Sequence, residues 1–149
     1  LNPERLSDEK DGMVVESLKE EPPQYFKGIE QLLKLLKEND IKLALATSAT
    51  QKTAMLLGKE LLNFFDARIF AEDVRCSKPN PEIFLKTAER LGLKNEDCII
   101  FEDAESGIEA SKAGGFFCIA KDNGFGQDLS KADLVIKEYN SLELMKFFQ

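Results

Sequence analysis

Histidine is absent from this 149-residue sequence, which removes the commonest general base and any zinc site built on imidazole. No run of about 18 apolar residues occurs, so the sequence predicts no transmembrane helix and no membrane partner. The charged start, LNPERLSDEK, does not have the pattern of a secretory signal peptide. This start also lacks methionine, and we therefore expect the chain to begin downstream of a natural N-terminus.

Clustered positive charge and paired cysteines are missing as well. The formal net charge of −7 argues against nucleic acid as a partner, because nonspecific binding needs clustered Lys and Arg. The three cysteines, Cys76, Cys98 and Cys118, are odd in number and are not spaced as metal ligands. Cys98 and Cys118 fall in strand-like runs, where a buried reduced thiol is expected, so we predict a cytoplasmic location.

What the sequence does contain is an alternation of strand-like and helix-like segments. Apolar runs of strand length are found at 41–47, 67–71, 98–102, 116–120 and, more weakly, 133–136. Helical patterns are found at 29–38, 47–64, 80–93, 105–115 and 141–148. Continuous apolar strands that alternate with helices are typical of an α/β fold. We therefore predict a Rossmann-like, three-layer domain whose parallel sheet is covered by helices on both faces.

The first 25 residues differ from the rest of the chain. They are charged and interrupted by prolines, and Pro22-Pro23 closes the region as a linker or hinge. We expect the α/β core to occupy residues 26–149 as one domain.

Three polar features follow predicted strands at widely separated points. Thr47 ends the first strand, Lys78 lies in the loop beyond the second, and Glu102-Asp103 ends the third. Ligands of open parallel sheets bind at the carboxyl ends of the strands, so we expect these features to converge on one edge.

Each feature has a functional and a structural interpretation. Glu102 and Asp103 are hard oxygen ligands suited to Mg²⁺, although Asp103 could also cap the following helix. Thr47, Ser48 and the backbone at Ala49 could bind phosphate at a helix start, or a hydroxyl there could simply cap that helix.

Lys78 is the third feature, in CSKPNP. It could place a positive charge against phosphate oxygens, or it could be an exposed loop lysine. Taken together, a hydroxyl, a lysine and an acid pair are the equipment of phosphoryl transfer, in which electrostatic stabilisation dominates. A nucleophile is missing, because Asp8 and Asp11 are preceded by no apolar strand that could position them.

The segments LALATSAT, CSKPNPEIF and IIFEDAESGIEASKAGG resemble, in order and spacing, the second, third and fourth motifs of the haloacid dehalogenase superfamily. The branch that they resemble most is that of the β-phosphoglucomutase-like phosphatases. The resemblance covers residues 25 to about 149. It implies that Thr47 hydrogen-bonds the transferring phosphoryl group, that Lys78 steadies it, and that Glu102 and Asp103 hold Mg²⁺.

The family's first motif, a strand followed by Asp-x-Asp, is not found in this sequence. It would supply the aspartate that forms the aspartyl-phosphate intermediate. The resemblance implies that residues 1–25 are a remnant of the helical cap and its hinge. It also implies that a central strand is missing between 41–47 and 98–102, which would leave a gap in the sheet. The missing N-terminal segment or another copy of the chain could fill that gap.

Two departures from the family pattern bear on the activity. Ala104 replaces the usual serine beside the acid pair, and residues 49–51 lack the Lys-Asn pair of the sugar-phosphate mutases. The resemblance therefore favours a Mg²⁺-dependent phosphatase acting on a small phosphorylated metabolite, with this chain alone inactive. A phosphomutase or a noncatalytic phosphate- or metal-binding remnant remains an alternative. A signalling receiver domain is disfavoured, because there the acid pair comes first along the chain and the Lys-Pro last.

Overall fold

The computed structural model describes residue 17 and residues 24–149. The predictions made for residues 1–16 and 18–23, including those for Asp8, Asp11 and the Pro22-Pro23 hinge, lie outside the described residues.

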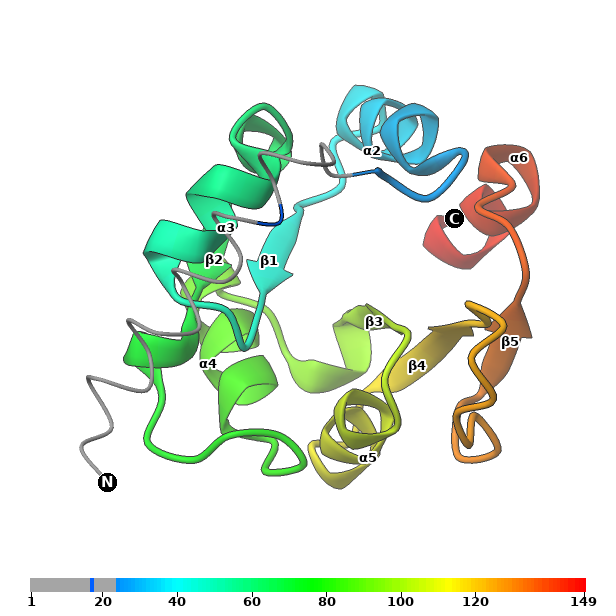
Figure 1. The fold of residues 1–149 in the computed structure, drawn as a ribbon. Coiled ribbons are helices and arrows are strands. Elements are labelled where there is room, and N and C mark those ends of the chain that lie inside the picture. The colour runs from blue at the N-terminus through cyan, green and yellow to red at the C-terminus, as the bar shows by residue number, and fades with distance from the viewer. Residues whose placement is uncertain (1–16, 18–23) are drawn as a thin grey trace.

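Five short strands and five α-helices make up the described part of the chain, and they alternate except that β5 follows β4 directly (Figure 1). The strands are β1 (Ala44–Ala46), β2 (Ala67–Ile69), β3 (Ile99–Glu102), β4 (Phe117–Lys121) and β5 (Leu134–Ile136). The α-helices are α2 (Ile29–Glu38), α3 (Gln51–Gly58), α4 (Glu82–Leu91), α5 (Glu105–Ala113) and α6 (Ser141–Leu144). Short 3₁₀ helices cover Leu61–Phe64, Ala71–Asp73, Asn95–Asp97 and Met145–Phe148.

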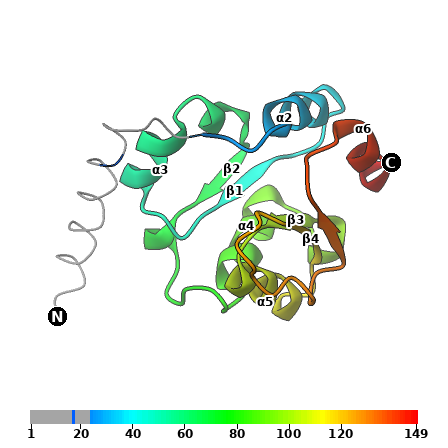
Figure 2. The same cartoon turned by 45° about the vertical axis from the view of Figure 1, so that its right-hand side comes forward.

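Every strand pairing is parallel, as predicted, but the strands form two sheets rather than one. One sheet has the order β1-β2 and the other the order β3-β4-β5 (Figure 2). β1 and β3 are half-buried along their whole length, whereas Cys118, Ile119 and Ala120 of β4 are fully buried. The break between the sheets therefore lies between β1 and β3, where the sequence predicts the gap.

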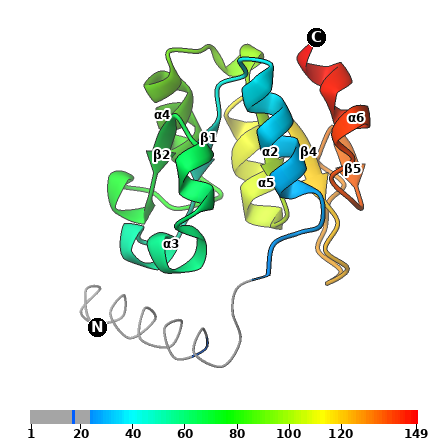
Figure 3. The ribbon, with the colours of Figure 1, turned by 90° about the horizontal axis from the view of Figure 1, so that it is seen from above.

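Helices cover both faces of this split sheet. On one face lie α2 and α6 (Figure 3). Their leucines are buried against Leu43 and Ile119, which belong to the two halves of the structure. On the other face, α4 and α5 pack over Ile69 and Phe116. The three-layer arrangement thus holds the two sheets together through shared apolar clusters, although no backbone ladder joins them within residues 24–149.

Helix α2 follows directly from its sequence. Leu32, Leu33 and Leu36 recur at helical spacing and are all buried. Gly28 precedes the helix with φ 88°, and a Cβ at this position would lie 2.3 Å from the Tyr139 carbonyl oxygen. Only glycine fits both the left-handed backbone and the close approach of the segment before α6.

The prediction of one helix over residues 47–64 is wrong in two respects: the helix begins later, and it is interrupted before residue 64. α3 begins at Gln51, with Thr50 as its N-cap, and ends at Gly58 before a separate 3₁₀ turn. Thr47 and Ser48 therefore belong to a loop and do not cap the helix. No helix in the described part of the chain is long and apolar enough to cross a membrane.

Candidate phosphoryl-transfer site

Lys78 and Glu102 form an ion pair at the carboxyl ends of the strands. The Lys78 ammonium donates to Glu102 Oε1, and the two side chains are only 11% and 9% exposed. The ammonium also lies 4.9 Å from the centroid of the buried Phe84 ring. The structure therefore does not support the interpretation of Lys78 as an exposed loop lysine.

The second oxygen of Glu102 is held by the backbone. Oε2 accepts hydrogen bonds from the N–H groups of Asp103 (3.0 Å) and Ala104 (3.1 Å). Ala104 is the N-cap of α5, and its own side chain makes no cap hydrogen bond. The interpretation of Asp103 as the cap is thus wrong, and Glu102 satisfies the N–H groups before the helix.

Gly107 makes room for this carboxylate. A Cβ on Gly107 would lie 2.1 Å from the Glu102 carboxyl carbon and 2.2 and 2.5 Å from its oxygens. The first turn of α5 can therefore approach Glu102 only because position 107 carries no side chain.

Asp103 is oriented differently from Glu102. Its Oδ2 lies 3.4 Å from the Asn123 side-chain amide, in the loop that follows β4. Tyr139 lies close enough to both acids for their charges to affect its ionisation. Burial, followed by the negative charges of Asp103 and Glu102, raises the pKa of the Tyr139 phenol to about 12. The two acids therefore have different surroundings: the Glu102 carboxylate pairs with Lys78, and the Asp103 carboxylate faces the β4–β5 loop.

Thr47, Ser48 and Ala49 form a tight loop after β1. The Thr47 N–H donates to the Ile69 carbonyl (3.0 Å), and the Ala49 N–H donates to the Thr47 hydroxyl oxygen (3.1 Å). Ser48 is exposed at the tip. The loop is thus fixed by its own hydrogen bonds and by β2, with the Ser48 hydroxyl presented outward.

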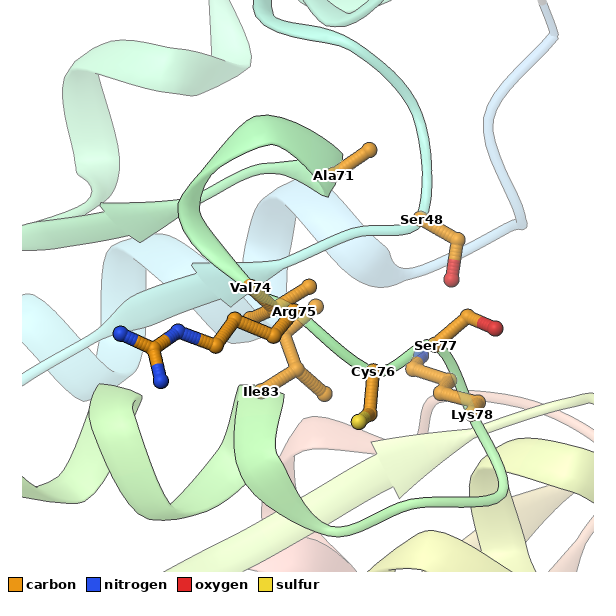
Figure 4. Close-up of a pocket in the computed structure, with 8 residues that line it drawn as sticks. All are labelled: Ser48, Ala71, Val74, Arg75, Cys76, Ser77, Lys78 and Ile83. Carbon is orange, nitrogen blue, oxygen red and sulfur yellow. The ribbon is translucent and has the colours of Figure 1, made fainter. Parts of the chain in front are cut away.

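A cavity of about 210 Å³ brings part of this loop to Lys78. Figure 4 shows Ser48 and Ser77 extending to the same side, beside Lys78. The cavity is lined by Ser48, Ala71, Val74, Arg75, Cys76, Ser77, Lys78 and Ile83. Segments after β1 and after β2 therefore meet at one hollow, while the pair of Lys78 with Glu102 connects that hollow to β3.

Glu82 holds the loop that carries Lys78. Its carboxylate accepts from the N–H groups of Arg75 (3.0 Å) and Cys76 (2.9 Å) and pairs with Lys86 (2.8 Å). Lys86 and then these two N–H groups lower the pKa of Glu82 to about 2. Pro81 is the N-cap of α4, and the Asn80 side chain accepts a hydrogen bond from the Glu82 N–H (3.0 Å).

The acid pair fits Mg²⁺, which uses one or two protein carboxylates and keeps several waters. Glu102 is the less available ligand, since its oxygens already accept from Lys78 and from two N–H groups. Within residues 24–149, no three His, Cys, Asp or Glu side chains cluster closely enough to enclose a metal ion. With one or two carboxylates from this pair, a magnesium ion here would keep several waters as ligands.

Sequence reasoning overlooks the residues that support this site. Gly107 and Glu82 both lie inside the recognised motifs, but no pattern reveals that they accommodate Glu102 and fix the Lys78 loop. Asn123 and Tyr139 lie outside the motifs and carry no sequence signal. They reach the site only because the β4–β5 loop and the segment after β5 fold back over it.

Comparison with known proteins identifies the family. The model of the haloacid dehalogenase-like hydrolases matches residues 8–121. The chain belongs to this family. Its β-phosphoglucomutase-like branch is supported by a phosphorylated carbohydrates phosphatase from Thermotoga maritima, 41% identical over 113 residues. A β-phosphoglucomutase from Bacillus subtilis is 36% identical over 123 residues.

Solved structures of this family also share the fold. The β-phosphoglucomutase from Clostridium difficile superposes with a TM-score of 0.74 at 32% identity, covering 89% of this chain and 59% of its own. CbbY from Rhodobacter sphaeroides, in complex with xylulose-(1,5)bisphosphate, superposes with a TM-score of 0.71 at 25% identity, covering 76% of this chain and 54% of its own.

The chain spans about half the length of the curated relatives that it matches. It covers 50% of the Thermotoga phosphatase and 54% of the Bacillus mutase, which correspond to 74% and 83% of this chain. The activities of the full-length relatives are therefore not assigned to these 149 residues by similarity alone.

Proposed function

We propose that this haloacid dehalogenase-like chain is the catalytic-core portion of a Mg²⁺-dependent phosphatase acting on a small phosphorylated metabolite. The observation that carries the proposal is the buried Lys78–Glu102 pair, placed beside a cavity that Ser48 also lines. The Glu102 carboxylate and the Phe84 ring hold the Lys78 ammonium in place. A positive charge fixed in this way can stabilise a phosphoryl group without having to reorganise during the reaction.

The roles of the chain's own residues follow from their positions. Thr47, Ser48 and the Ala49 backbone would bind the phosphoryl oxygens, and Lys78 would offset their negative charge. Asp103, with Glu102, would hold Mg²⁺, which when bound would offset the negative charge on the phosphoryl oxygens. The three cysteines are unpaired thiols, in keeping with the reducing cytoplasmic setting that we predict.

The nucleophile would come from a strand that lies between β1 and β3. This proposal is supported by the half-buried state of both strands and by the break in the sheet between them. A parallel strand inserted there would pair both edges and end beside Lys78, where an aspartate at its carboxyl end could be phosphorylated.

A phosphomutase is the second candidate, favoured by the 36% identity to the Bacillus β-phosphoglucomutase. The two activities differ in the acceptor, which is water for a phosphatase and a sugar hydroxyl for a mutase. Product analysis separates them, since only the phosphatase releases inorganic phosphate from a glucose phosphate.

The test uses the protein extended by the coding sequence upstream of Leu1. With Mg²⁺, this protein should hydrolyse p-nitrophenyl phosphate, and Lys78→Ala and Asp103→Ala should each reduce kcat at least about a hundredfold, as expected for lost charge stabilisation. Lys94→Ala is the matched control, because Lys94 is highly exposed and remote from the cavity. Full activity in both site variants would refute the proposed roles, and rapid Mg²⁺-dependent turnover by residues 1–149 alone would refute the external nucleophile.

A further inference from the structure

Asn123 and Gly124 form the one Asn-Gly dipeptide of the sequence, and they lie in the loop that follows β4. Asparagine is chemically labile, because the backbone nitrogen of the next residue can attack its side-chain amide. Glycine in that next position allows the attack most readily, since it has no side chain to hinder the closing ring. Gly124 is exposed, and a Cβ placed on it would meet no atom within 4 Å, so the loop leaves room for the ring to form.

The two groups that would react already have suitable hydrogen-bond partners. The Gly124 N–H, which must lose its proton, donates to Asp122 Oδ1 (2.9 Å). The side-chain oxygen of Asn123, which gains negative charge during the attack, accepts from the Phe125 N–H (3.1 Å). A carboxylate on the attacking N–H can assist as a general base, and a donor on the carbonyl oxygen stabilises the developing charge. The folded loop therefore favours the ring closure.

A third contact joins this loop to the acid pair. The Asn123 Nδ2, which is the group that would leave, lies 3.4 Å from Asp103 Oδ2. After it leaves, a carboxylate at position 123 would stand beside the Asp103 carboxylate. Two neighbouring negative charges attract a divalent cation more strongly than one does, and the affinity of an oxygen-ligand site depends on its number of charged ligands.

We propose that Asn123 is a site of spontaneous deamidation, that the loop 122–125 promotes it, and that its product adds a carboxylate beside Asp103. First, the Gly124 nitrogen bonds to the Asn123 Cγ, the Cγ–Nδ2 bond breaks, and Nδ2 leaves as ammonia with the Gly124 proton. One water molecule then opens the succinimide ring and gives aspartate or isoaspartate, without any oxidation or reduction. The expected effect on Mg²⁺ binding rests on the proposed function, whereas the deamidation does not.

The rate of deamidation is measured on residues 1–149 at pH 8, by mass spectrometry of digested samples. A synthetic peptide of residues 120–127 has the same Asn-Gly dipeptide without the folded loop. The test variant is Asp122→Ala, made in both the protein and the peptide. Asp128→Ala in the protein is the matched control, because Asp128 accepts from the Ser130 N–H (2.9 Å) in the same way but in a different turn.

In the folded protein, Asn123 should deamidate at least as fast as in the peptide and faster than Asn63 or Asn140. Asp122→Ala should slow the reaction at least about threefold in the protein, a small part of what a positioned base contributes. It should change the peptide little, and Asp128→Ala should keep the wild-type rate. A folded protein that reacts more slowly than the peptide would overturn the proposal, as would an Asp122→Ala effect that is absent or equally large in the peptide.

The effect on the metal is measured by titrating Mg²⁺ into ¹⁵N-labelled residues 1–149 and following the Asp103 amide resonance by NMR. Asn123→Asp should bind Mg²⁺ at least about threefold more tightly than the wild type, the screened effect of one added charge. Asn63→Asp adds the same charge at an exposed position before β2 and should keep the wild-type affinity.

Equal Mg²⁺ affinities in the wild type and in Asn123→Asp would overturn the link between Asn123 and the acid pair. A failure of the proposed function has a different signature. In that case Mg²⁺ leaves the Asp103 resonance unmoved in every variant, which refutes the metal role of the acid pair. The deamidation rates then still decide the modification of Asn123 by themselves.

Discussion

The Lys78 ammonium is paired with the Glu102 carboxylate, which follows it by 24 residues and belongs to a different part of the sheet edge. Both side chains are about one-tenth exposed, so the pair is largely shielded from water. Removing water strengthens the attraction but also makes either partner costly when it is left alone. The pair therefore couples the loop after β2 to the end of β3 and fixes the cation of the proposed site.

A double-mutant cycle on Lys78 and Glu102 should reveal this coupling. Lys78→Met and Glu102→Gln should each lower the unfolding free energy by about 3 kcal/mol, because each leaves a shielded group without its partner. The double variant should lose less than the sum, with a coupling energy of about 0.5–3 kcal/mol. Urea unfolding measures all four proteins, and strictly additive losses would show that the two residues do not interact.

Gly107→Ala should destabilise the protein by about 1–3 kcal/mol, because its Cβ would overlap the Glu102 carboxyl group and force it to move. Gly58→Ala is a matched control in another helix, where a Cβ would meet only the Tyr25 hydroxyl at 3.8 Å. That variant should be neutral or more stable by about 0.5–1 kcal/mol, the ordinary gain from replacing a helical glycine. Thermal unfolding of the two variants checks the contrast, and equal effects would contradict the steric role of Gly107.

Acid should destabilise the protein partly through Glu82. The native state holds the pKa of Glu82 at about 2, below its ordinary value of 4.5, so its contribution is complete above about pH 4.5 and is lost as the pH falls toward 2. In the Glu82→Gln variant, the unfolding free energy should therefore decrease less steeply between about pH 4.5 and pH 2 than in the wild type. Glu89→Gln, at an exposed position on the same helix, should keep the wild-type slope, and identical slopes in all three proteins would count against the prediction.

The three thiols should react in the order of their exposure. Cys76 is exposed, Cys98 is half-buried and Cys118 is buried, and burial raises the pKa of both Cys98 and Cys118. Because the thiolate is the reactive form, iodoacetamide at pH 8 should modify Cys76 first and Cys118 only on unfolding. Mass spectrometry of digested samples gives the order, with Cys76→Ser as the control. Early modification of Cys118 in the native protein would mean that β4 is more open than the structure shows.

Much of the fold could be read from local patterns. The leucine spacing of α2 and the apolar runs of β3 and β4 placed these elements within a few residues of their observed bounds, since periodicity and strand length are local properties. The start of α3 could not be placed in this way. Thr47, Ser48 and Thr50 are all suitable caps, and the choice of Thr50 depends on Thr47 being bonded to β2 and on Glu72 reaching Gln51.

The candidate site divides in the same manner. Lys78 and Glu102 could be selected because each follows a predicted strand and together they match family motifs. That Glu102 pairs with Lys78 could not be predicted, because the contact spans 24 residues and depends on Gly107 admitting the carboxylate. The predicted roles of Thr47, Ser48, Ala49, Lys78, Glu102 and Asp103 in binding phosphate and metal stay predictions.

The sequence by itself determined the parallel α/β class, the order of the elements and the family. These depend on the spacing of apolar residues and on short motifs, which are written along the chain. The tertiary structure alone decided which carboxylate holds Lys78, which residue caps α3 and where Glu72 lies. Those are contacts between segments distant in sequence, and they form only when packed helices bring the strand ends together.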